Sequence, residues 1–169
     1  VRELASRLQV IKTTDVHTDT VIMWINIYNY QSKQHREQQA LLDLISILVA
    51  EWGPKVQHIV CGGDWNASIS PRTGYSTDSL TSTADKRLST WLKSNSMNTL
   101  KTVEPINPTW CSHSHEQSAV LDRFLVRLPN TPTCMVLPAQ HVVHDHSIIC
   151  MSLDAVSYTH LRAHETLMN

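Results

Sequence analysis

The chain has 169 residues, of which 41 % are hydrophobic and 17 % are charged, a composition suited to one domain with a packed core. Fourteen Lys and Arg residues against fifteen Asp and Glu residues give a net charge of −1, so overall charge recruits neither a polyanion nor an acidic membrane. No apolar run is long enough to span a bilayer, the N-terminus lacks a signal-peptide pattern, and the four cysteines form no CxxC pair. These features predict an intracellular protein, nuclear or cytoplasmic, with no membrane partner.

The first part of the chain alternates strand, helix and strand. The apolar, β-branched run Val21–Tyr28 predicts a strand that is buried on both faces. Apolar residues repeat at helical spacing over residues 33–52, with Ser32 as the expected N-cap and a Gly-Pro pair as the stop. Residues 56–61 predict a second strand. This alternation favours an α/β layered fold.

The second part predicts one more helix and three more strands. Residues 68–83 are rich in Ser, Thr, Gly and Pro and are expected to form a surface loop. An amphipathic pattern predicts a helix over residues 84–96. Apolar runs of strand length lie at residues 119–128, at Cys134–Leu137 and at residues 147–153.

The segment "GGDWN" is the first candidate site. Two glycines after a strand favour a sharp turn, which would present Asp64 and Asn66 at the C-terminal edge of a sheet. In an extended conformation these two side chains share one side, and Trp65 points away. A carboxylate beside a carboxamide suits phosphodiester hydrolysis, because the carboxylate deprotonates a water and the amide holds a phosphoryl oxygen. The alternative is an ordinary turn rich in Asp and Asn.

Three further features, which involve four residues, favour a phosphate site. Asp122 lies in an apolar row of a predicted strand, where a carboxylate needs a partner such as a histidine or a metal, unless that face is solvated. Asp145 and His146 precede an apolar strand, so the imidazole can donate to a phosphate oxygen while Asp122 fixes its tautomer. Tyr28 ends the first strand, and its phenol either reaches the same phosphate or simply packs.

In this order, "NIY", "GGDWN", "PTW", "LDRFLV" and "DH" resemble the endonuclease/exonuclease/phosphatase superfamily, which has the deoxyribonuclease-I-like fold. The set is most similar to the endonuclease domain of LINE-type non-LTR retroelements. The resemblance implies a partial four-layer α/β sandwich, with two packed mixed β-sheets flanked by helices and the N-terminal part of the domain missing. Residues 1–153 would be the C-terminal part of that domain, and residues 154–169 look like a non-native, adapter-derived tail.

The resemblance also implies a role for each catalytic candidate. Asp64 would activate the water, and Asn66 would bind the phosphate. His146 would stabilise charge on the phosphoryl oxygens, Asp122 would orient His146, and Tyr28 would help to position the phosphate.

The resemblance further implies Mg²⁺ or Mn²⁺ as the cofactor, with Asp145 and Asp64 as ligands and no small-molecule cofactor. The family's early Asn motif and metal-binding Glu motif would lie upstream of Val1. We therefore expect a fragment that lacks full activity. DNA is the expected partner, and the parent protein is expected to continue into a reverse transcriptase.

Two alternatives stay open at this point. The first is a host phosphodiesterase or phosphatase of the same superfamily. The second is an unrelated zinc-binding protein, because the ligand types that zinc prefers gather in the second half of the chain. These residues are Cys111, His113, His115, Cys134, His141, His144 and His146. Their spacing lacks the paired CxxC and H-x-H-x-D-H patterns of common zinc sites.

Overall fold

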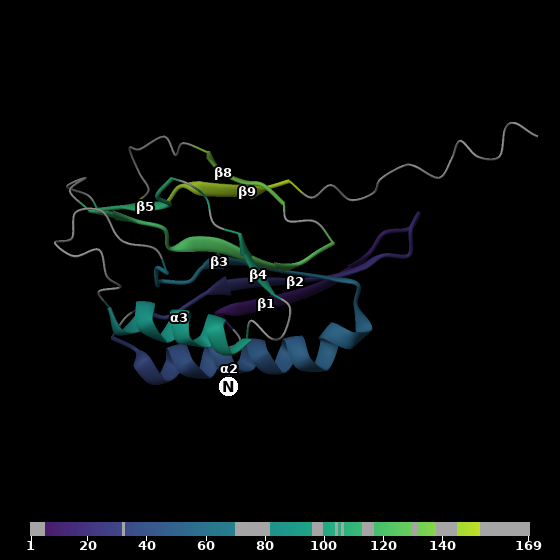
Figure 1. Cartoon of the computed structure of the whole chain (residues 1–169), viewed down its shortest axis with the longest axis horizontal. Helices are drawn as coiled ribbons and strands as arrows, with labels where there is room; N and C mark the ends of the chain where they lie inside the picture. The colour runs from purple at the N-terminus through teal and green to yellow at the C-terminus, as the bar shows by residue number, and fades with distance from the viewer. Residues whose placement is uncertain are drawn as a thin grey trace, which may run out of the picture.

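The computed structural model describes residues 6–31, 33–69, 82–95, 100–103, 105, 107–112, 117–129, 132–137 and 145–152. The elements are β1 (Leu8–Thr14), β2 (Val21–Tyr28), α2 (His35–Trp52), the 3₁₀ turn η1 (Gly53–Lys55), β3 (His58–Asp64), α3 (Thr83–Asn95), β4 (Lys101–Val103), β5 (Trp110–Cys111), β6 (Ser118–Ala119), β7 (Asp122–Arg127), β8 (Cys134–Leu137) and β9 (Ile148–Met151). Helices α2 and α3 lie on one face of a central sheet, and the β8–β9 pair lies on the opposite face (Figure 1). The expected α/β class is confirmed.

The central sheet has five strands in the order β1-β2-β3-β7-β4. Strands β2 and β3 are parallel, because helix α2 provides the crossover between them, and the other neighbours are antiparallel. The register sets Tyr28 beside Asp64, and Asp64 beside Asp122. Three of the predicted site residues therefore meet at one edge of the sheet.

Helix α2 covers the sheet through one apolar stripe, formed by Leu41, Leu42, Ile45 and Val49. The predicted helix is confirmed over most of its length, but it begins at His35. Its N-cap is Gln34, which makes no side-chain capping hydrogen bond, so the prediction of a cap at Ser32 is wrong. Neither described helix is long and apolar enough to cross a membrane.

Strand β2 has the predicted bounds, but it is not buried on both faces. Met23, Ile25 and Ile27 are buried in the core with α2, whereas Asn26 and Tyr28 on the other face are exposed. The reason is that the β8–β9 pair covers only part of the second face, where Val60, Val103 and Val126 form a smaller cluster.

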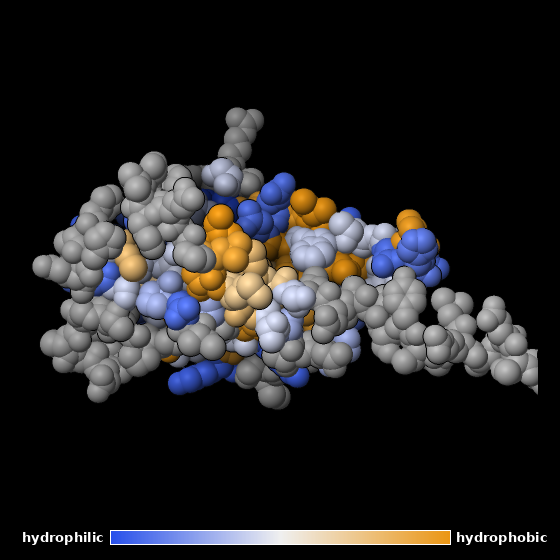
Figure 2. All heavy atoms as spheres, turned by 90° about the horizontal axis from the view of Figure 1, so that it is seen from above, coloured by the Kyte–Doolittle hydropathy of each residue, from blue (hydrophilic) through white to orange (hydrophobic). Residues whose placement is uncertain are grey.

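The β8–β9 pair carries apolar side chains on both of its faces. Cys134 and Met151 pack toward the central sheet. The outer face exposes Met135, Leu137 and Ile148, and Figure 2 shows hydrophobic side chains gathered on this side of the molecule. Neither described helix covers this face (Figure 1). In the part of the chain that the structure describes, helices thus flank the sandwich on one side.

The predicted strand over residues 119–128 is interrupted. Ser118–Ala119 pairs with Trp110–Cys111, and the chain leaves that pairing before it begins β7 at Asp122. The interruption puts Asp122 at the first position of β7, beside the end of β3.

Candidate active site

The two glycines of the "GGDWN" segment lie inside a strand. A Cβ at Gly62 would approach the Phe124 ring to 2.5 Å, and a Cβ at Gly63 would overlap the carbonyl oxygen of Ile27. Gly63 also has a φ of +136°, which residues with a side chain rarely adopt. The prediction of a sharp turn here is wrong. The glycines let β2 and β7 approach closely, and the strand runs on to Asp64.

Asp64 and Asn66 lie together, as predicted, but for a different reason. Asn66 is in the left-handed region with a φ of +48°, a conformation that Asn tolerates better than most residues. Its backbone N–H donates to Asp64 Oδ1 at 2.7 Å, and its Nδ2 donates to Asp64 Oδ2 at 3.0 Å. Trp65 points away into the core, where its Nε1 donates to the Arg123 carbonyl at 3.2 Å.

Asn29 supports this pair and was missed from the sequence. Its carbonyl accepts the second hydrogen bond of Asn66 Nδ2 at 2.8 Å, and its own Nδ2 donates to the Trp65 carbonyl at 2.9 Å. Its backbone N–H donates to the Asp64 carbonyl at 2.8 Å. Asn29 is 2 % exposed. An Asn directly after a predicted strand, beside the candidate Tyr28, was the available signal.

His146 and Asp122 form the second pair of the site. His146 Nδ1 lies 2.9 Å from Asp122 Oδ2, and the two side chains are 33 % and 13 % exposed. The predicted hydrogen bond is confirmed. It provides the partner that a carboxylate beside apolar side chains requires.

Trp110 ties the neighbouring Asp145 in place. Trp110 Nε1 donates to Asp145 Oδ2 at 3.1 Å, and the backbones of Trp110 and His146 form an isolated antiparallel bridge. The sequence singled out "PTW" as a motif but gave Trp110 no role in the site.

All six predicted residues line one pocket of about 650 Å³ at the sheet edge. They are Tyr28, Asp64, Asn66, Asp122, Asp145 and His146. Tyr28 is 51 % exposed, and its ring packs against the Arg7 guanidinium, whose carbon lies 4.5 Å from the ring centroid. The structure therefore brings the whole candidate set together.

The pocket alters the acidity of two groups. The pKa of Asp64 is raised to about 6, mainly by burial and also by the nearby Asp122 charge, and the hydrogen bond from the Asn66 backbone partly offsets this increase. The hydrogen bond to Asp122 raises the pKa of His146 above its usual value, and burial opposes that effect. The site thus combines Asp64, whose pKa is raised toward 7, with His146, whose protonated ring is stabilised.

The donor set suits a hard cation with an incomplete protein shell. Asp64 and Asp145 offer carboxylate oxygens, and Mg²⁺ is commonly held by one or two carboxylates together with waters and substrate phosphates. In the described part of the chain, no group of three His, Cys, Asp or Glu side chains converges on one point. Four of the zinc candidates lie outside the described residues, namely His113, His115, His141 and His144.

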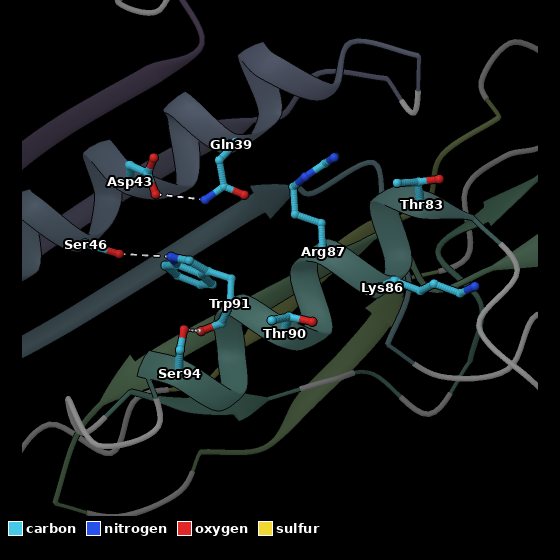
Figure 3. A pocket seen from close by; sticks show the side chains of 9 residues that line it. All are labelled: Gln39, Asp43, Ser46, Thr83, Lys86, Arg87, Thr90, Trp91 and Ser94. Carbon is cyan, nitrogen blue, oxygen red and sulfur yellow. Dashed lines mark hydrogen bonds between the residues drawn. The ribbon is translucent and has the colours of Figure 1, made fainter.

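A second pocket, of about 440 Å³, lies between α2 and α3 (Figure 3). Two hydrogen bonds join pairs of its lining side chains: Trp91 Nε1 donates to Ser46 Oγ at 2.9 Å, and Gln39 Nε2 donates to Asp43 Oδ1 at 2.8 Å. None of the predicted site residues lines it. We therefore assign the chemistry to the pocket at the sheet edge.

A family model described as "Endonuclease-reverse transcriptase" matches residues 22–150. The chain belongs to this family. The endonuclease-reverse transcriptase match spans the strands and connections that carry all six pocket residues. Among curated proteins there is no significant match.

Solved structures that this member of the family resembles agree on its fold. The endonuclease domain of TRAS1, a telomere-specific non-LTR retrotransposon, is 17 % identical with a TM-score of 0.59, over 88 % of this chain and 64 % of that chain. A 3′ phosphatase from Neisseria, bound to product DNA hairpin, is 14 % identical with a TM-score of 0.64, over 86 % and 65 %. The 3′-5′ exonuclease from Neisseria meningitidis is 15 % identical with a TM-score of 0.64, also over 86 % and 65 %. The chain thus spans slightly less than two thirds of each relative, and it has the deoxyribonuclease-I-like fold.

Proposed function

We propose that this pocket belongs to a metal-dependent DNA endonuclease domain of a retroelement. The observation that carries the proposal is the meeting of two hydrogen-bonded pairs, Asp64 with Asn66 and Asp122 with His146, in one pocket. Family membership supports phosphodiester hydrolysis, because the family description and two of the similar structures are those of nucleases. The retroelement assignment is supported by the family description and by the TRAS1 domain.

Asp64 is the proposed general base. Its pKa of about 6 leaves it ionised at neutral pH yet basic enough to accept a proton from water, which is the range that general bases use. Asn66 Nδ2 is fixed by the Asp64 carboxylate and the Asn29 carbonyl. That fixed amide keeps the carboxylate oriented and borders the space for a phosphoryl oxygen.

His146 is the proposed donor to the phosphoryl oxygens. Its Nδ1 faces Asp122, so the other ring nitrogen, Nε2, is available to the substrate. A raised pKa favours the charged ring, and a preorganised cation aimed at developing negative charge lowers the barrier. Tyr28 completes this side of the pocket with its exposed phenol.

Asp64 and Asp145 are the proposed ligands of Mg²⁺ or Mn²⁺. When bound, the metal would offset charge on the phosphate, a contribution of several kcal/mol to the barrier. Because the described residues supply two such carboxylates rather than a group of three, we expect the 169-residue chain to nick DNA weakly. We place the domain in an intracellular protein that continues into a reverse transcriptase.

Closed circular plasmid distinguishes the endonuclease from the second candidate, an end-directed phosphatase or exonuclease like the Neisseria relatives. An endonuclease converts supercoiled plasmid to nicked circles, because it needs no terminus. A phosphatase or exonuclease leaves the circle intact and acts on a 3′-phosphorylated or recessed oligonucleotide. We expect nicking that requires Mg²⁺. If activity is confined to 3′ ends, the endonuclease proposal is wrong and the phosphatase or exonuclease function takes its place.

A further inference from the structure

The Asp122–His146 pair joins segments that belong to different sheets. Asp122 begins β7 in the central sheet, whereas His146 precedes β9 in the two-stranded sheet. A contact of 2.9 Å between their side chains requires both backbones to be held in register. A displacement of only about 1 Å at a catalytic group can lower turnover by roughly 100-fold.

Thr109 contacts both of these segments. Its Oγ1 accepts hydrogen bonds from the backbone N–H groups of Leu121 and Asp122, each at 3.0 Å. Its carbonyl oxygen accepts from the N–H of Ser147 at 2.7 Å, immediately after His146. Thr109 is 0 % exposed, so bulk water does not compete for these bonds.

The residues around Thr109 extend the same connection. The Thr109 N–H donates to the Ala119 carbonyl at 3.0 Å, and the Cys111 N–H donates to the Asp145 carbonyl at 3.0 Å. Residues 109–111 therefore run between β6 on one side and the Asp145–His146 backbone on the other. Within this segment, the Thr109 hydroxyl adds the side-chain contact to the first residue of β7.

We infer that Thr109 is a positioning residue, which aligns the Asp122 carboxylate with the His146 ring from outside the pocket. Thr109 is not among the residues that line that pocket. It acts through two backbones: its hydroxyl fixes the start of β7, and its carbonyl fixes the segment that carries His146. The inference deepens the proposed function, and its catalytic consequence rests on that function.

The matched variants Thr109→Ser and Thr109→Ala test it, because both remove the methyl group and they differ only in the hydroxyl oxygen. The first readout needs no activity: the NMR signal of the hydrogen-bonded His146 ring Nδ1–H, assigned by its absence in His146→Gln. We expect Thr109→Ser to keep this signal and Thr109→Ala to lose it or shift it strongly. The second readout is plasmid nicking, where Thr109→Ala should lower kcat by about 10- to 100-fold with little change in KM, and Thr109→Ser should restore it.

Ser46→Ala is the control for a general loss of stability. Ser46 Oγ also accepts a hydrogen bond from a core side chain, Trp91, but it lies between α2 and α3 (Figure 3). The Ser46→Ala substitution should leave the His146 signal and kcat unchanged. An intact His146 signal in folded Thr109→Ala would overturn the inference, as would failure of Thr109→Ala to fold while Thr109→Ser folds, since the hydroxyl would then serve the whole fold. If Thr109→Ala loses or shifts the His146 signal, Thr109→Ser keeps it, and wild type does not cleave DNA, the positioning role of Thr109 is supported and the endonuclease proposal is contradicted.

Discussion

The ring of His146 is hydrogen-bonded to Asp122 at 2.9 Å across 24 residues of sequence. This contact brings the entrance of β9 to the start of β7, which itself pairs with the end of β3 at Asp64. The acidic and the basic parts of the candidate site are thereby fixed relative to each other. Substitutions of the pocket residues Asp122, Asp64 and Asn66, and of the two glycines that precede Asp64 in β3, test this arrangement and the fold that supports it.

Asp122→Ala should lower nicking by about 100-fold without unfolding the protein. It should also return the pKa of His146 toward its usual value, because the Asp122 hydrogen bond is the main cause of the increase. A raised histidine pKa contributes stability below the unfolded value of 6.5, and that stability is lost as pH rises through the folded pKa. The variant should therefore lose more Tm at pH 6 than at pH 9. Unchanged turnover with an ordinary melting curve would contradict this role.

Asp64→Asn should flatten the acid side of the stability curve, measured in EDTA. The folded pKa of Asp64, about 6, lies above the usual 3.8, so its contribution is favourable at low pH and is lost as pH rises through about 6. Between pH 4.5 and 7.5, wild type should lose roughly 3–6 °C more in Tm than Asp64→Asn. Parallel curves would mean that Asp64 ionises normally.

Gly63→Ala should destabilise the fold more than Gly62→Ala. The methyl group at Gly63 meets the backbone of Ile27 at a positive φ, whereas at Gly62 it meets the side chain of Phe124, which can move. We expect a loss of roughly 4 kcal/mol or more for Gly63→Ala and about 1–3 kcal/mol for Gly62→Ala. Urea denaturation measures both, and equal losses would mean that backbone overlap is not the limiting contact.

Asn66→Gly and Asn66→Ala separate the backbone role of Asn66 from its amide. Glycine accepts the φ of +48° and should keep most of the stability, whereas alanine should cost roughly 1 kcal/mol more. Both variants lose the Nδ2 contact with Asp64, so both should nick poorly. Full activity in Asn66→Gly would show that the amide has no part in the reaction.

The sequence predicted strand β2 and helix α2 because the pattern that determines each of them lies within its own residues. The β-branched run of β2 and the helical spacing of α2 each contain the residues that decide the element. Strand β1 was missed because six of its seven residues are exposed. Its sequence therefore carries no pattern of buried positions, and the strand is defined by its pairing with β2. The expected cap at Ser32 lies outside the described residues, and α2 begins at His35 with Gln34 at its N-cap position.

The site was predictable at residues whose side chains are themselves acids or bases, such as Asp64, Asp122 and His146. Supporting residues were not, because their roles depend on distant partners. Thr109 serves through backbone groups of β7 and of the segment before β9. Arg123 is 0 % exposed and its Nη2 donates to the Val120 carbonyl at 2.6 Å, and such burial of a charged residue has no sequence signal.

The most direct test of the account is Mg²⁺-dependent nicking of supercoiled plasmid, with Asp64→Ala beside Ser46→Ala. The sequence should be expressed both as these 169 residues and with any upstream coding sequence of its transcript, which we expect to increase the rate. The account predicts EDTA-sensitive nicked circles from wild type and Ser46→Ala, and a loss of roughly 1000-fold or more in Asp64→Ala, since removal of a catalytic base and metal ligand abolishes both contributions. Nicking that survives Asp64→Ala, or its absence from the extended protein, would contradict the assignment of this pocket as a phosphodiesterase site.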